Sequence, residues 1–166
     1  MAIIGMNHAV LYVRDATVHQ AFYRDVLDFE TVMEAPDGQF VFMRGSASAN
    51  HHDIAFFTIG PAAEPSVAGK RTVGLYHLAW QVATLDELVL MHERLRTVGA
   101  LAGASDHGTS KSLYAKDPDG LEFEVMWLVP AEHWGVEAHE ATTRPLDLSA
   151  EQRRFAALGS AAGTDD

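Results

Sequence analysis

The sequence repeats one order of elements twice, and this internal repeat restricts the fold more than any other feature. Residues 7–13 alternate in the manner of a β-strand, and residues 15–27 follow with apolar side chains at helical spacing. The same order returns in the second half, with a strand pattern over residues 76–82 and a helical pattern over residues 84–98. Recurrence of one supersecondary unit indicates a duplicated module.

The repeat continues after each helix with further strand patterns. These patterns cover residues 29–34, 39–44 and 52–59 in the first half and residues 100–104, 112–116 and 121–128 in the second. Turn residues separate them, as in Pro36-Asp37-Gly38 and Asp117-Pro118-Asp119-Gly120. The sequence therefore predicts an α+β fold of two βαβββ modules, over residues 5–60 and 73–130.

Local signals set the remaining boundaries. Thr84 followed by Glu87 predicts a capping box at the start of the second helix, and Gly99 predicts its end. We expect a single domain over residues 1–130 and a C-terminal extension over residues 131–166. In the extension we expect irregular chain over 131–148, a short amphipathic helix over 149–158, and a frayed end over 159–166.

Composition excludes several classes of function. The 166-residue chain has a formal net charge of −11, which repels phosphate backbones, so nucleic acid is not an expected partner. No apolar run is long enough to cross a bilayer, and the N-terminus lacks the basic region of a secretory signal. We therefore expect neither membrane insertion nor export. The absence of cysteine excludes disulfides and thiolate ligands and favours a reducing cytoplasm.

Candidate metal ligands occur at equivalent positions of the two modules. His8 and His77 each lie at the start of the first strand pattern of a module, and Glu124 lies in the last strand pattern of the second. Side chains alternate between the faces of a strand, so Glu122 shares a face with Glu124. Two histidines and one carboxylate form the facial triad that suits Fe(II), and also Mn(II) or Zn(II). Three protein ligands leave coordination positions open for a substrate.

A simpler interpretation of these residues remains open. A histidine at the start of an apolar strand is commonly an ordinary edge residue, and the neighbouring carboxylate Glu122 could simply face solvent. Two histidines at matching positions of a duplicated unit favour the metal site, however. A carboxylate within a core-like strand also requires a cation or several hydrogen-bond donors.

The paired modules and the segment Asp117-Pro118-Asp119-Gly120-Leu121-Glu122-Phe123-Glu124 resemble the vicinal oxygen chelate superfamily. This superfamily includes glyoxalase I, antibiotic-resistance proteins and the type I extradiol dioxygenases. The resemblance covers residues 5–130 and implies one open mixed β-barrel around a metal site. In the family, the ligands come from the first, fifth and eighth strands, which here carry His8, His77 and Glu124.

Two further segments resemble the type I extradiol catechol dioxygenases in particular. His52-Asp53-Ile54-Ala55-Phe56 is similar to a segment with an acid–base histidine, and Asp106-His107-Gly108 with Ser112-Leu113-Tyr114 is similar to a stretch with a pocket histidine and a tyrosine. The resemblance implies catalytic roles for His52, His107 and Tyr114, with Fe(II) as the metal. Four other histidines have no counterpart in these family segments, and we expect them to lie on the surface: His19, His92, His133 and His139.

Three functions follow as hypotheses. The first is an extradiol dioxygenase that opens a small aromatic catechol with O2. The second is a glyoxalase-like lyase, isomerase or transferase, in which Asp53 would be a fourth ligand. Because neighbouring side chains of a strand point to opposite faces, His52 and Asp53 cannot both face the metal. The third is a metal-free protein that binds an aromatic drug. Homodimers are common in the family that this sequence resembles, and the edge strand of each module could pair with another chain. We therefore expect a homodimer or higher homo-oligomer.

Overall fold

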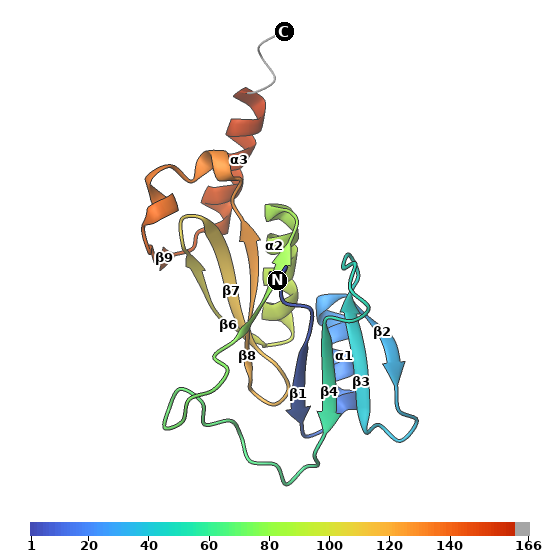
Figure 1. Ribbon diagram of the computed structural model, residues 1–166. Helices are drawn as coiled ribbons and strands as arrows, with labels where there is room; N and C mark the ends of the chain where they lie inside the picture. The colour runs from blue at the N-terminus through green and yellow to red at the C-terminus, as the bar shows by residue number, and fades with distance from the viewer. Residues whose placement is uncertain (162–166) are drawn as a thin grey trace. The chain divides into compact units, whose positions relative to one another are not determined.

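A computed structural model describes residues 1–161 and confirms the α+β class, with a βαβββ order in each half (Figure 1). The chain divides into two compact units. Unit 1 comprises residues 1–74 together with the turn 117–121, and unit 2 comprises residues 75–116 and the chain from 122 onward. Hydrogen bonds join the strands into one open mixed sheet in each unit. Within residues 1–161, no helix has the combination of length and apolar composition that a bilayer crossing requires.

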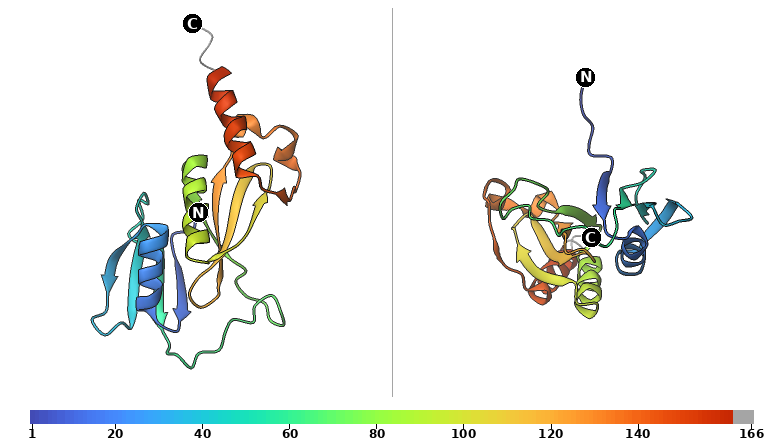
Figure 2. Two further views of the ribbon diagram at one scale, coloured as in Figure 1. Left: turned by 180° about the vertical axis from the view of Figure 1, so that it is seen from behind. Right: turned by 90° about the horizontal axis from the view of Figure 1, so that it is seen from below.

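Unit 1 is a four-stranded sheet with one helix on its face. The strands are β1 (Ala9–Val13), β2 (Phe29–Glu34), β3 (Phe40–Gly45) and β4 (Ile54–Thr58), and the helix is α1 (Ala16–Leu27). Their order is β1-β4-β3-β2, and β1 runs parallel to β4. Figure 2 shows α1 packed along one face of this sheet. Between the helix and the sheet, the ring centroid of Tyr23 lies 4.8 Å from that of Phe56.

Unit 2 repeats this plan with a five-stranded sheet. Its modular elements are β5 (Leu78–Val82), α2 (Leu85–Thr97), β6 (Leu101–Asp106), β7 (Ser110–Lys116) and β8 (Glu122–Leu128). The strand order is β5-β8-β7-β6-β9, with β5 parallel to β8. Leu88 and Leu95 of α2 are fully buried together with Leu113 and Val125 of the sheet. The predicted capping box is present, because Thr84 accepts from Glu87 N while the Glu87 carboxylate accepts from Thr84 N.

The C-terminal extension is more ordered than the sequence predicts. It contains two 3-10 helices, Ala131–His133 and Gly135–His139, the strand β9 (Arg144–Pro145) and the helix α3 (Leu148–Ala161). β9 adds to the free edge of β6, and such a two-residue strand has no periodic signal in the sequence. Phe155 of α3 packs edge-on against Trp127 at 4.9 Å. The expected fraying of residues 159–166 falls largely outside the described residues.

The expectation that His19 lies on the surface is wrong. Its side chain is 1% exposed, on the buried face of α1, and its ring lies 5.0 Å from that of Phe56. Nδ1 lies 3.0 Å from the Asp15 carbonyl oxygen, and Nε2 lies 3.2 Å from Oδ2 of Asp117 in the turn 117–121. Both partners are acceptors, so the imidazolium form satisfies both ring nitrogens. Sequence periodicity could not reveal a partner 98 positions away.

The charge of His19 makes unit 1 sensitive to pH. Burial lowers the pKa of His19, but the hydrogen bonds to Asp117 and Asp15 and the charges of Asp117 and Asp119 outweigh burial, so the pKa is raised above 6.5. The stabilisation is therefore complete below the unfolded-state pKa and is lost as the pH rises through the folded-state pKa.

We predict that His19→Gln, which keeps a donor but removes the charge, lowers the free energy of unfolding by roughly 1–2 kcal/mol at pH 5.5 and by less at pH 8.5. Urea denaturation at both pH values measures the difference. The exposed His139→Gln is the matched control and is expected to have no effect at either pH. A His19→Gln deficit that grows toward alkaline pH would contradict the assignment of an imidazolium.

Candidate functional site

Three of the predicted site residues are cross-strand neighbours in unit 2. His77 directly precedes β5, and the parallel register pairs Ala79 with Glu124 of β8, which puts His77 and Glu124 on one face of the sheet. The antiparallel register pairs Glu124 with Tyr114 of β7. His77 Nε2 lies 3.0 Å from Glu124 Oε2, and the rings of His77 and Tyr114 are 5.7 Å apart.

The His77–Glu124 pair has the spacing and chemistry of two metal ligands. Two donors, each about 2.1 Å from one ion at a right angle, are about 3 Å apart, and His77 Nε2 and Glu124 Oε2 match that separation at 3.0 Å. Glu124 is only 8% exposed, so its charge requires a cation or donors nearby. His77 Nδ1 is buried and has no hydrogen-bond partner in the described part of the chain. The residues present therefore fit a divalent metal ion.

Glu122 lies on the other side of the His77 ring. Its Oε1 is 3.7 Å from His77 Nδ1, and it is half-buried on the same face as Glu124. With Nε2 on a metal, Nδ1 would carry the proton, and Glu122 is the carboxylate nearest to it. A carboxylate that accepts a hydrogen bond from the second nitrogen of a ligand histidine orients its ring, but 3.7 Å exceeds hydrogen-bond distance. Glu122 is therefore close to the His77 ring and only partly exposed, without a hydrogen bond to it.

Tyr114 and His107 form a hydrogen-bonded pair next to His77 and Glu124. His107 Nε2 lies 2.8 Å from the Tyr114 hydroxyl oxygen, and its Nδ1 lies 3.0 Å from the carbonyl oxygen of Thr142. Burial and the charge of Glu124 raise the pKa of Tyr114, so the phenol keeps its proton at neutral pH. Thr142 was not predicted as part of the site, because a backbone carbonyl leaves no signal in the sequence.

The remaining predicted residues, His8 and His52, meet in unit 1. They precede the parallel strands β1 and β4, and their rings are 4.3 Å apart. His8 Nδ1 lies 2.8 Å from Oδ1 of Asn7; donation to this oxygen leaves Nε2 with its lone pair, as a metal ligand requires. His52 Nε2 is buried without a hydrogen-bond partner in the described chain. Desolvation and the neighbouring His8 and His51 lower the pKa of His52.

Asp53 faces away from this pair of histidines. Its carboxylate accepts hydrogen bonds from Gly45 N at 2.9 Å, Ser48 Oγ at 2.8 Å and Asn50 Nδ2 at 2.7 Å. These bonds close the loop between β3 and β4. Burial raises the pKa of Asp53, but the three donors outweigh burial and lower it overall. The carboxylate is therefore already satisfied within the loop.

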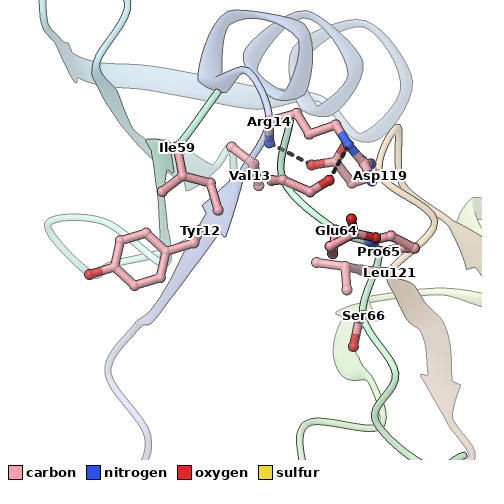
Figure 3. Close-up of a pocket in the computed structure, with 10 residues that line it drawn as sticks. Tyr12, Val13, Arg14, Ile59, Glu64, Pro65, Ser66, Asp119 and Leu121 are labelled. Carbon is pink, nitrogen blue, oxygen red and sulfur yellow. Dashed lines mark hydrogen bonds and ion pairs between the residues drawn. The ribbon is translucent and has the colours of Figure 1, made fainter. Parts of the chain in front are cut away.

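The candidate ligands are thus distributed over the two units. Within residues 1–161, no group of three histidine or carboxylate side chains converges as one metal site. His77 and Glu124 pair in unit 2, and His8 lies with His52 in unit 1. A separate pocket in unit 1 has none of these residues in its lining (Figure 3). It contains the ion pair between Arg14 Nη1 and Asp119 Oδ1, which are 2.9 Å apart.

Comparison with known sequences identifies the family. The sequence model of the Glyoxalase/Bleomycin resistance protein/Dioxygenase superfamily matches residues 5–125. The chain belongs to this superfamily. Biphenyl-2,3-diol 1,2-dioxygenase 3 of Rhodococcus globerulus is 32% identical over 121 residues, which are 72% of this chain and 61% of that protein. The chain therefore spans less than two thirds of the length of this relative.

Solved structures support the same fold. A glyoxalase/bleomycin resistance protein/dioxygenase domain from Frankia sp. EAN1pec aligns with a TM-score of 0.63 at 22% identity, covering 80% of this chain and 98% of that one. A fosfomycin resistance protein from Listeria monocytogenes aligns with a TM-score of 0.58 at 21% identity, covering 80% and 99%. Identities this low establish the fold of the superfamily but not an activity.

The role of Asp53 is open to a direct test. We predict that Asp53→Asn lowers the free energy of unfolding by about 1–2 kcal/mol at pH 7 through loss of charge-assisted hydrogen bonds, and leaves Mn(II) affinity unchanged. Because the pKa of Asp53 is lowered on folding, the deficit is full above the unfolded-state pKa and shrinks as the pH falls through the folded-state value. Thermal denaturation and metal titration measure the two quantities. Loss of metal binding would instead make Asp53 a ligand.

Proposed function

We propose that the chain is an extradiol ring-cleavage dioxygenase that opens a catechol-type aromatic with O2. The observation that carries the proposal is the unit 2 face on which a His77–Glu124 pair, spaced as two metal ligands, adjoins a Tyr114–His107 hydrogen bond. The first supplies a place for the metal and the second a place for the hydroxyl groups of a substrate. The similarity to a biphenyl-2,3-diol dioxygenase supports the same substrate class.

In this proposal His8, His77 and Glu124 hold one Fe(II) ion, and Mn(II) or Zn(II) suits the same donors. The bound metal supplies Lewis acidity that favours the catecholate form and the redox capacity to activate O2. The hydrogen bond of His8 Nδ1 to Asn7 leaves the Nε2 lone pair of His8 for the metal. In unit 2, His77 Nε2 and Glu124 Oε2 are the two donor atoms. Glu122, whose Oε1 lies 3.7 Å from His77 Nδ1, steadies the imidazole through its charge and not through a direct hydrogen bond.

The other polar residues handle protons. His52 Nε2 is buried and has no hydrogen-bond partner among the described residues. It can therefore accept a proton from a substrate hydroxyl and return it later. Tyr114 remains a neutral phenol. Its hydroxyl donates a hydrogen bond to His107 Nε2, and its oxygen accepts a hydrogen bond from the substrate.

Other activities of the superfamily are less well supported by these residues. A glyoxalase-like site with a fourth carboxylate ligand would use Asp53, which is committed to the loop between β3 and β4. A metal-free drug-binding protein does not require a buried carboxylate facing an imidazole. A dioxygenase site uses the buried Glu124 carboxylate beside His77 and leaves Asp53 in its loop.

We predict that the protein, loaded anaerobically with Fe(II) and then given a panel of catechols and air, forms a yellow ring-fission product and consumes O2. Absorbance and an oxygen electrode follow the reaction. His77→Ala and Glu124→Ala are expected to lose activity together with metal, and His52→Ala to lose activity while it retains metal. The exposed His139→Gln is the matched control. Tight binding of an aromatic without turnover or metal would contradict the proposal.

The role of Glu122 can be tested without any substrate. We predict that Glu122→Gln weakens Mn(II) binding roughly tenfold, because the amide lacks the charge that steadies the His77 imidazole. Calorimetric titration measures the affinity. Glu140→Gln, at an exposed position, makes the same change in charge and is expected to bind Mn(II) as the wild type does. Equal affinity in Glu122→Gln would remove Glu122 from the site.

A further inference from the structure

The C-terminal extension reaches the site through His107. The Thr142 carbonyl oxygen lies 3.0 Å from His107 Nδ1, and the Thr143 hydroxyl lies 3.3 Å from the same atom. The other ring nitrogen, Nε2, lies 2.8 Å from the hydroxyl of Tyr114. The His107 ring is therefore held between the extension on one side and a predicted site residue on the other.

These contacts determine which nitrogen of His107 carries the proton. A backbone carbonyl can only accept a hydrogen bond, so the nearest partner of Nδ1 requires an Nδ1–H group. In neutral imidazole the other nitrogen, Nε2, is then an acceptor. Tyr114 must consequently donate its hydroxyl proton to Nε2, which leaves the lone pairs of its oxygen directed at other donors. The carbonyl of Thr142 thus sets the direction of the Tyr114 hydrogen bond.

Several contacts hold Thr142 in place. The adjacent strand β9 pairs with the end of β6, where Arg144 is opposite Asp106. The Arg144 guanidinium lies 3.1 Å from Asp106 Oδ2 and also contacts Glu137. Asp106 is in turn paired with Lys111, which is fully buried. Arg144 therefore ties the segment before α3 to the strand that precedes His107.

Gly108 shows how closely the extension approaches the His107 loop. Its φ of +75° lies in the left-handed region, and a Cβ at this position would be 2.7 Å from the Glu137 carboxylate carbon. A side chain here would be strained and would push Glu137 away. The backbone next to His107 and the first part of the extension are thus in direct contact within unit 2.

We infer that the C-terminal extension is a positioning element of the site, in which Arg144 anchors the Thr142 carbonyl and that carbonyl fixes His107 as the Nδ1–H tautomer. The tautomer makes the Tyr114 oxygen an acceptor toward the substrate. The catalytic consequence rests on the proposed dioxygenase function, whereas the tautomer itself does not. Arg144 is a positioning residue because it acts through Thr142 and His107.

Nitrogen-15 NMR of histidine-labelled protein tests the inference without metal or substrate. We expect His107 to be the Nδ1–H tautomer in the wild type and in Tyr114→Phe, because the carbonyl and not the phenol determines it. Arg144→Ala is expected to shift His107 toward a mixture of tautomers. Arg153→Ala, at an exposed position of α3, is the matched control and is expected to retain the Nδ1–H form.

An Nε2–H tautomer in the wild type, or its appearance in Tyr114→Phe, would overturn the role of the Thr142 carbonyl. An unchanged tautomer in Arg144→Ala, with circular dichroism confirming the fold of every variant, would overturn the role of Arg144. If the dioxygenase reaction is found, Arg144→Ala is expected to lower kcat roughly tenfold with little change in KM. Absence of that reaction would refute the proposed function and leave the NMR result standing.

Discussion

The parallel pairing of β5 with β8 is the constraint on which the site depends. Its register puts His77 and Glu124, which are remote in the sequence, on one face of the unit 2 sheet with Nε2 and Oε2 3.0 Å apart. The antiparallel neighbour β7 adds Tyr114 opposite Glu124. Unit 1 repeats the arrangement, because the parallel pairing of β1 with β4 brings His8 beside His52. Duplication of one module thus yields two related groups of polar side chains from one topology.

Buried charge explains much of what surrounds these strands. A carboxylate removed from water requires a cation or several donors, and the buried and half-buried carboxylates of this protein meet that need in different ways. Asp117 faces the His19 imidazolium, Asp53 is surrounded by donors of its own loop, and Asp106 is paired with Lys111 and Arg144. Glu124 has His77 as its partner, in a spacing that suits a shared metal. This contrast distinguishes the carboxylates that stabilise the fold from the one suited to chemistry.

Periodicity and turn residues predicted the α+β class, the order of elements in both modules and the capping box at Thr84, because these features depend on local sequence. Strand alternation also predicted that Glu122 and Glu124 share a face, whereas the register that brings His77 beside Glu124 came only from the structure. The buried position of His19, the strand β9 and the contact of Thr142 with His107 could not be predicted in this way. They depend on tertiary partners or on a backbone carbonyl, and neither is encoded in a residue pattern.

We propose that His8, His77 and Glu124 hold one metal ion that serves catechol cleavage. A crystal structure of the Fe(II)-loaded protein, with anomalous scattering recorded at the iron edge, tests this metal site. We expect a single strong peak coordinated by these three side chains, with His52 and not Asp53 facing it. A peak on other residues, a fourth protein ligand from Asp53, or no peak after anaerobic loading would contradict it.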